Sequence, residues 1–146
     1  MDSFKIIGIS VRTINKDGHA KNDIGNLWQQ WFAENVSSKI PNKINDDIVN
    51  MYTEYESDEI GFYTTILGHR VNSLTSVPEG MIGKEIPASN YLELVSEGKL
   101  PECVLDTWER IWRMTLDRKY LADFDVYKPE LMNPESAIVK TYVSIN

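Results

Sequence analysis

The chain has 146 residues and a mass of 16.8 kDa, and its composition is 42% hydrophobic and 25% charged. These values exclude a disordered or collagen-like chain and fit one domain with a substantial core. The 22 acidic residues outnumber the 15 basic ones and give a net charge of −7, which argues against direct binding to nucleic acid or to an anionic membrane. Such a surface suits cationic partners, although the same charge also serves solubility.

The N-terminal part of the sequence predicts a strand followed by an amphipathic helix. Residues 4–13 are rich in β-branched residues whose apolar members alternate, as in a strand with one buried face. After a polar loop, an apolar stripe with helical spacing predicts a helix capped by Asn22 or Asp23. The stripe consists of Ile24, Leu27, Trp28, Trp31 and Phe32.

The remaining elements predict a hairpin and then a second unit of similar composition. Residues 48–55 and 60–67 predict two strands joined by an acidic turn. Extended sequence at 81–95, broken at Pro87, leads to a helix for which Pro101 is a suitable first residue. The stripe of this helix is Val104, Trp108, Ile111, Trp112 and Thr115, and the last two strands are predicted at 123–127 and 137–145.

The predicted order is strand, helix, strand, strand, written twice, over about residues 3–73 and 79–146. Both helices carry a pair of aromatic residues four positions apart, Trp28 with Phe32 and Trp108 with Trp112. We therefore expect a single α+β domain, 1–146, of two pseudo-symmetric modules. Each module would be a three-stranded sheet with one helix, and a central ligand cleft would lie between them.

Few residues suit metal or thiol chemistry. Cys103 is the only cysteine, so no internal disulfide can form and a reduced, cytoplasmic setting is the simplest interpretation. The two histidines, His19 and His69, lie in glycine-containing, turn-like contexts and are expected to be solvated. We find no signal-type N-terminus and no apolar run long enough to span a bilayer. No metal and no cofactor are expected.

Several short motifs, in this order and spacing, cover nearly the whole chain: 23–28, 55–58, 61–64, 86–88 with Tyr91, Trp108 with 111–112, and 122–127. Through them the sequence resembles the GyrI-like, or AraC-type, effector-binding superfamily, and within it the integron-associated effector-binding proteins and stand-alone predicted transcription regulators. The resemblance implies a duplicated strand-helix-strand-strand (SHS2) fold that binds small molecules, often cationic and aromatic. Related multidrug-sensing regulators fuse this domain to a DNA-binding domain.

The resemblance also implies a site residue. Family members carry an acidic residue, usually glutamate, in a strand motif of the form aromatic-Glu-x-Tyr, and it serves as the buried counter-charge of the ligand. The matching residue is Asp125, whose side chain is one methylene shorter.

Alternation along the strand sends Asp123, Asp125 and Tyr127 to one face and Phe124 and Val126 to the other. We expect the second pair to pack under the helix and Asp125 to face the cleft, with Asp123 solvated. Aromatic faces attract cations and could wall the cleft, although core packing is the first explanation for most helix aromatics. The candidate ligand-binding residues are Asp125, Tyr127, Tyr91, Trp108, Tyr63 and Trp28; Tyr52 is a weaker candidate.

The expected function is a stand-alone binding protein for cationic, lipophilic or aromatic compounds that acts in transcription-regulator-type sensing or in sequestration. One alternative is a small-molecule hydrolase of the same superfamily that uses a carboxylate and tyrosines, but no catalytic residue can be assigned from the sequence. The other is a protein-binding module like the relatives proposed to inhibit gyrase. A separate regulator protein and a homodimer both stay open as partners.

Overall fold

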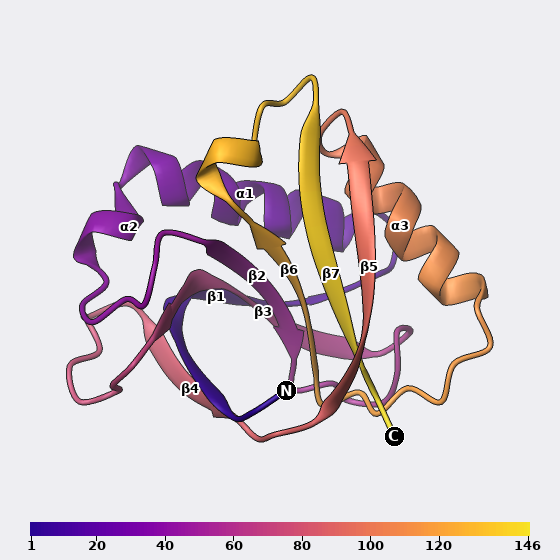
Figure 1. Cartoon of the computed structure of the whole chain (residues 1–146), viewed down its shortest axis with the longest axis horizontal. Coiled ribbons are helices and arrows are strands. Elements are labelled where there is room, and N and C mark those ends of the chain that lie inside the picture. Colours follow the sequence, from indigo (N-terminus) through magenta and orange to yellow (C-terminus); the bar gives the residue numbers. More distant parts are fainter.

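The computed structural model describes residues 1–146 as a large antiparallel sheet with few helices, an α+β fold (Figure 1). In chain order the elements are β1 (Phe4–Ile14), α1 (His19–Ala33), α2 (Val36–Lys39), β2 (Ile48–Thr53), β3 (Phe62–Val71), β4 (Ile82–Ile86), β5 (Asn90–Gly98), α3 (Glu102–Arg113), β6 (Ala122–Tyr127), η1 (Pro129–Leu131) and β7 (Ala137–Ile145).

The strands form one seven-stranded sheet in the order β4-β1-β3-β2-β6-β7-β5. The two expected three-stranded sheets, β1-β3-β2 and β6-β7-β5, are thus parts of one continuous sheet, with β4 as an additional edge strand. Strands β2 and β6 pair antiparallel, with Asn50 opposite Asp125, and so join the two halves through backbone hydrogen bonds. The predicted break at Pro87 is confirmed, because β4 and β5 lie at opposite edges of the sheet.

Helix α1 begins earlier than the sequence predicted. It starts at His19 rather than at Asn22 or Asp23, directly after Gly18, whose φ of 76° lies in the left-handed region. The amide of Asn22 donates to the Gly18 carbonyl at 3.1 Å, so the first turn is already formed before the predicted cap. The predicted loop after the helix also contains the short helix α2.

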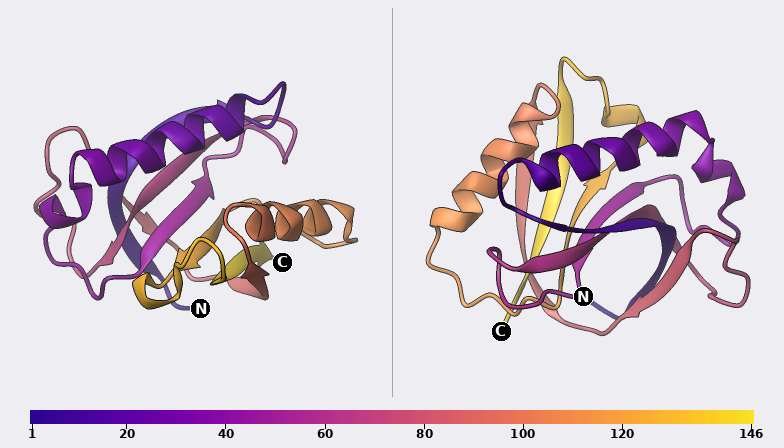
Figure 2. Two further views of the ribbon diagram at one scale, coloured as in Figure 1. Left: turned by 90° about the horizontal axis from the view of Figure 1, so that it is seen from above. Right: turned by 180° about the vertical axis from the view of Figure 1, so that it is seen from behind.

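The two long helices contact different parts of the sheet. Helix α1 packs on β1 and β3, and α3 packs on β5. Both views in Figure 2 show α1 and α3 as separate helices, each over its own strands. We call the sheet face that they cover the helix face. Its core includes Ile9, Leu27 and Trp31 in the first half and Trp108 and Val139 in the second half.

A second, smaller core lies on the opposite face of the sheet. It consists of Ile6, Val49, Met51, Ile66, Ile86, Ala122 and Phe124, none of which is more than 1% exposed. Strands β1 and β6 are separated by β3 and β2, yet the rings of Phe4 and Phe124 pack edge-on with centroids 5.3 Å apart. The sheet therefore curls strongly, and this curl closes the second core.

The curl passes through a pair of facing glycines, Gly8 on β1 and Gly68 on β3. A Cβ atom on Gly8 would lie 2.2 Å from the Leu67 carbonyl oxygen, and one on Gly68 would lie 2.1 Å from the Ile7 carbonyl oxygen. Both obstacles are backbone atoms, so neither position can accept a side chain without moving a strand.

Candidate functional site

The carboxylate of Asp125 lies at the middle of the helix face, completely buried. Three side chains donate hydrogen bonds to it. The Tyr52 hydroxyl lies 2.7 Å from Oδ2, the Thr141 hydroxyl 2.5 Å from Oδ1, and Trp108 Nε1 3.1 Å from Oδ1. The donors come from β2, β7 and α3, so the site spans the pairing of β6 with both neighbouring strands.

Strand register places these groups together. Thr141 is directly opposite Asp125 on β7, and Tyr52 lies two residues along β2 from Asn50, the residue opposite Asp125 on the other side. Residues two apart on a strand share a face, so Tyr52 reaches the same surface as Asp125. Trp108 lies on the buried side of α3, together with Val104 and Ile111, and points its indole N–H at the carboxylate.

Burial raises the pKa of Asp125 to about 6, and the neighbouring Asp123 charge acts in the same direction. The hydrogen bonds from Thr141, Tyr52 and Trp108 oppose this rise because they stabilise the charged form. Burial and the Asp125 charge also raise the pKa of Tyr52 well above its ordinary value, so Tyr52 stays protonated and remains a donor. The Asp125 carboxylate is thus charged at neutral pH, although its burial makes the charged form less favourable than it would be in water.

No basic side chain forms an ion pair with Asp125, whereas Asp123 has one. The Arg118 guanidinium lies 2.8 Å from Asp123 Oδ2, and both side chains are nearly inaccessible to solvent. The Tyr55 hydroxyl and the backbone and hydroxyl of Ser144 also donate to this carboxylate. The expectation that Asp123 is solvated is therefore wrong: it belongs to a buried ion pair with its own counter-charge.

Aromatic side chains surround the Asp125 carboxylate. The Tyr52 ring packs edge-on against Trp108, with centroids 5.3 Å apart, and against Tyr63 at 6.0 Å. On the other side, Tyr127 packs edge-on against Trp28 of α1 at 4.9 Å. Of the predicted site residues, Trp108 therefore contacts Asp125 directly. Tyr63 reaches it through Tyr52, and Trp28 packs against Tyr127, two residues along β6 from Asp125.

The predicted assignment of faces on β6 is reversed. Phe124 lies in the core of the opposite face, and it is Asp125 that lies under α3. Tyr91 packs against Phe124, with ring centroids 5.4 Å apart, and so lies on the opposite face too. The structure thus does not bring Tyr91 to Asp125. Phe124 fills the second core instead, and under the helix the Asp125 carboxylate accepts the indole N–H of Trp108.

Two exposed aromatic residues continue the helix aromatics toward solvent. Phe32 is 65% exposed and stacks on Trp28, one turn earlier on α1, with centroids 6.1 Å apart. Trp112 is 43% exposed and follows Trp108 by one turn of α3. Because residues four apart share a helix face, α1 carries a half-buried and an exposed aromatic residue on the side that borders the site, and α3 carries a buried and an exposed one.

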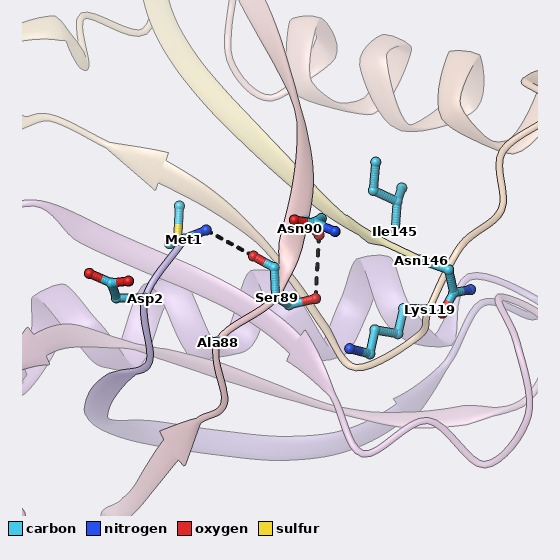
Figure 3. Close-up of a pocket in the computed structure, with 8 residues that line it drawn as sticks. All are labelled: Met1, Asp2, Ala88, Ser89, Asn90, Lys119, Ile145 and Asn146. Atoms are coloured by element: carbon cyan, nitrogen blue, oxygen red, sulfur yellow. Dashed lines mark hydrogen bonds between the residues drawn. The ribbon is translucent and has the colours of Figure 1, made fainter.

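Two surface hollows lie away from Asp125. One, of about 580 Å³, lies between the termini and the start of β5 and is lined by Met1, Asp2, Ala88, Ser89, Asn90, Lys119, Ile145 and Asn146 (Figure 3). Another, of about 490 Å³, lies along β1 and β4 beside the Lys84–Glu54 ion pair. Neither hollow includes a predicted site residue. The Asp125 carboxylate itself is enclosed by side chains and is 0% exposed.

The structure adds further findings on the kinds of site present. No group of three or more His, Cys, Asp or Glu side chains is arranged to hold a metal ion. No helix is long and apolar enough to cross a membrane.

His69, expected in a solvated turn, lies in β3 and is 1% exposed. The sequence suggested a turn because Gly68 precedes it, but that glycine serves the close approach of β1 and β3.

The chain is similar to proteins of a known family. The model of the integron-associated effector binding protein family (Cass2) matches residues 1–145. The chain belongs to this family. Membership confirms the resemblance found in the sequence and supports a role in binding small molecules.

The relatives agree with this assignment. The Bacillus subtilis (strain 168) protein named "Putative transcriptional regulator protein YobU" is 31% identical over 152 residues, covering 99% of this chain and 94% of that protein. The structure of the Vibrio cholerae integron cassette protein VCH_CASS2 is 26% identical, with a TM-score of 0.76 over all of this chain and 92% of that one. SAV2435 bound to tetraphenylphosphonium shares the fold at a TM-score of 0.83 and 17% identity, over all of this chain and 90% of that one.

Proposed function

We propose that the chain binds cationic, lipophilic aromatic molecules at Asp125 and acts in the cytoplasm as a sensor or a sequestering module. One observation carries the proposal. Asp125 is a fully buried carboxylate with three hydrogen-bond donors and aromatic neighbours, but with no cation paired to it. The adjacent Asp123, equally buried, has Arg118 as its counter-charge.

The energetics favour a cationic ligand. A charged carboxylate in a protein interior costs several kcal/mol unless an opposite charge compensates it. A ligand cation placed beside Asp125 would supply that charge, and each aromatic face it meets would add about 0.5–2 kcal/mol. Apolar groups on the ligand would gain from burial against Trp28, Trp108, Tyr63 and Tyr127. A neutral ligand of the same shape would gain only the burial.

Entry requires a rearrangement of side chains between α1 and α3. Trp28 and Trp108 cover the site from the two helices, and the exposed rings of Phe32 and Trp112 continue the same helix sides outward. We infer that a ligand first meets the exposed rings and then displaces one of the inner ones. Such a site is closed when empty and opens only around a ligand that can compensate Asp125.

The position of the site suggests a symmetric origin. The units β1–α1–β2–β3 and β5–α3–β6–β7 have the same order of elements. We infer that they are related by a pseudo-twofold axis between β2 and β6, the two strands that pair at the centre of the sheet. The ligand would then lie at the junction of the two modules.

A solved structure with the same fold supports the class of ligand. SAV2435 is bound to tetraphenylphosphonium, a permanent cation that carries four phenyl rings. Its identity to this chain is low, so we take from it only the kind of molecule, and we take the site from the buried carboxylate found here.

The test is a calorimetric titration of the full chain at pH 8 with two matched compounds. Methyltriphenylphosphonium is a cation, and triphenylphosphine oxide is a neutral molecule with the same three phenyl rings. We expect the cation to bind at least tenfold more tightly, because only the cation compensates Asp125. Equal affinities, or no binding of the cation, would refute the proposed function.

A further inference from the structure

A serine and a histidine form a hydrogen-bonded pair apart from the Asp125 site. Ser37 lies on α2, and its Oγ is 2.7 Å from Nε2 of His69 on β3. The other ring nitrogen, Nδ1, lies 2.8 Å from the Asp47 carbonyl oxygen, just before β2. The two hydrogen bonds hold the imidazole from both ends.

The carbonyl of Asp47 fixes the tautomer of His69. A carbonyl oxygen only accepts, so Nδ1 must carry the proton that bridges to it. In the neutral ring Nε2 then has a free lone pair, and the Ser37 hydroxyl donates to it. The serine proton is therefore already directed at a basic nitrogen, which is the arrangement that a nucleophilic serine needs.

The surroundings keep His69 neutral. The ring is 1% exposed and packs edge-on against Trp31, with centroids 5.1 Å apart. Burial lowers the pKa of His69, and the Lys43 charge acts in the same direction. The Asp47 carbonyl and the charges of Asp46 and Asp47 oppose this effect but do not reverse it. The base is thus unprotonated at neutral pH.

Ser37 is the less buried member of the pair. Its residue is only partly buried, and the next two residues, Ser38 and Lys39, are exposed, whereas His69 is 1% exposed. The serine therefore lies on the solvent side of the pair, and the base is covered behind it. Ser38 offers a built-in comparison, because its hydroxyl donates to the Asn35 carbonyl at 2.8 Å and has no base beside it.

We propose that Ser37 is a reactive serine that takes up the acyl group of small activated esters, with His69 as its general base. Ser37 Oγ attacks the ester carbonyl carbon as its proton moves to Nε2 of His69. The bond between that carbon and the aryl oxygen breaks, and the leaving phenolate takes the proton from His69. Water then attacks the acyl-serine, giving a proton to His69 that returns to Ser37 Oγ when the carboxylic acid leaves.

The experiment measures acetylation of the full chain by p-nitrophenyl acetate, with peptide mass mapping to locate the acetyl group. General-base assistance typically contributes about 10²-fold or more, so we expect Ser37 to react about 100-fold faster than Ser38. Acetylation of Ser37 that is no faster than that of Ser38 would overturn the proposal. This comparison lies within the wild-type chain and needs no variant to fold.

Variants then separate the roles. Ser37→Ala should abolish the rapid acetylation, and the matched change Ser38→Ala should leave its rate unaltered. His69→Gln should slow the reaction of Ser37 by about 100-fold. If Ser37 reacts equally fast in His69→Gln, the assigned base is refuted. A long-range proton–nitrogen NMR spectrum of the wild type should place the ring proton on Nδ1, and a proton on Nε2 would refute the hydrogen-bond direction.

Discussion

Replacing Asp125 by asparagine removes one buried negative charge and changes the side-chain volume very little. Each pKa unit corresponds to about 1.4 kcal/mol, so the rise from 3.8 to about 6 means that the surroundings of Asp125, with burial only partly offset by its three hydrogen bonds, disfavour the charged carboxylate by a net amount of about 3 kcal/mol. A bound cation compensates most of this cost, but asparagine carries no charge to compensate. We therefore expect Asp125→Asn to weaken binding of methyltriphenylphosphonium by about 100-fold.

Calorimetry at pH 8 measures this loss, and triphenylphosphine oxide provides the ligand control. Its affinity should change less than about threefold, because a neutral ligand does not use the charge. Asp106→Asn, an equal change of charge at an exposed position of α3, should leave both affinities unaltered. Equal weakening of the cationic and neutral ligands, or no weakening of either, would refute the reasoning.

The other predictions concern pH, the buried ion pair and the curl of the sheet. With its pKa at about 6, Asp125 is charged in about one molecule in ten at pH 5, so cation affinity should be about tenfold lower there than at pH 8; a pH-independent affinity would contradict this. Because its pKa is higher in the folded than in the unfolded state, its contribution should also lower the unfolding free energy of the ligand-free protein as pH rises from about 4 to 6. Arg118→Met should destabilise the fold by about 3–5 kcal/mol in urea unfolding, and adding Asp123→Asn should restore most of the loss; no recovery in the double variant would contradict the pairing. Gly8→Ala should cost about 1–3 kcal/mol, whereas Gly25→Ala, in open space on α1, should gain about 0.5–1 kcal/mol; equal effects would rule out the steric argument.

Much of the secondary structure could be predicted because it depends on patterns in short stretches of the sequence. The alternation in β1, the helical stripes of α1 and α3 and the break at Pro87 each determine a local structure without reference to the rest of the chain. The pairing of β2 with β6 could not be predicted in this way, because it joins residues far apart in the sequence. That pairing makes one sheet out of the two that the sequence suggested.

The site was only partly predictable for the same reason. Asp125 and Trp108 carried a signal, one through the family motif and the other through the helical stripe. Thr141 and Tyr52 contact the carboxylate only because β7 and β2 flank β6, and that depends on register. Alternation separated the two sides of β6 correctly, but it could not tell which side the helices cover. The packing of Phe124 in the second core and the hydrogen bond from Trp108 to Asp125 show which side they cover.

The antiparallel pairing of β2 with β6, the seam between the two halves of the molecule, determines which parts of the chain a bound ligand would affect. Asp125 belongs to one half of the molecule and its partner Tyr52 to the other, so a ligand at the proposed site would contact both halves. Relative to the ligand-free protein, ligand binding should then slow deuterium exchange of the backbone amides of β2 and β6 more than that of the edge strands β4 and β5. A bound ligand would therefore be detectable as reduced mobility of the central strands β2 and β6, and a partner that contacts either half of the molecule could sense it.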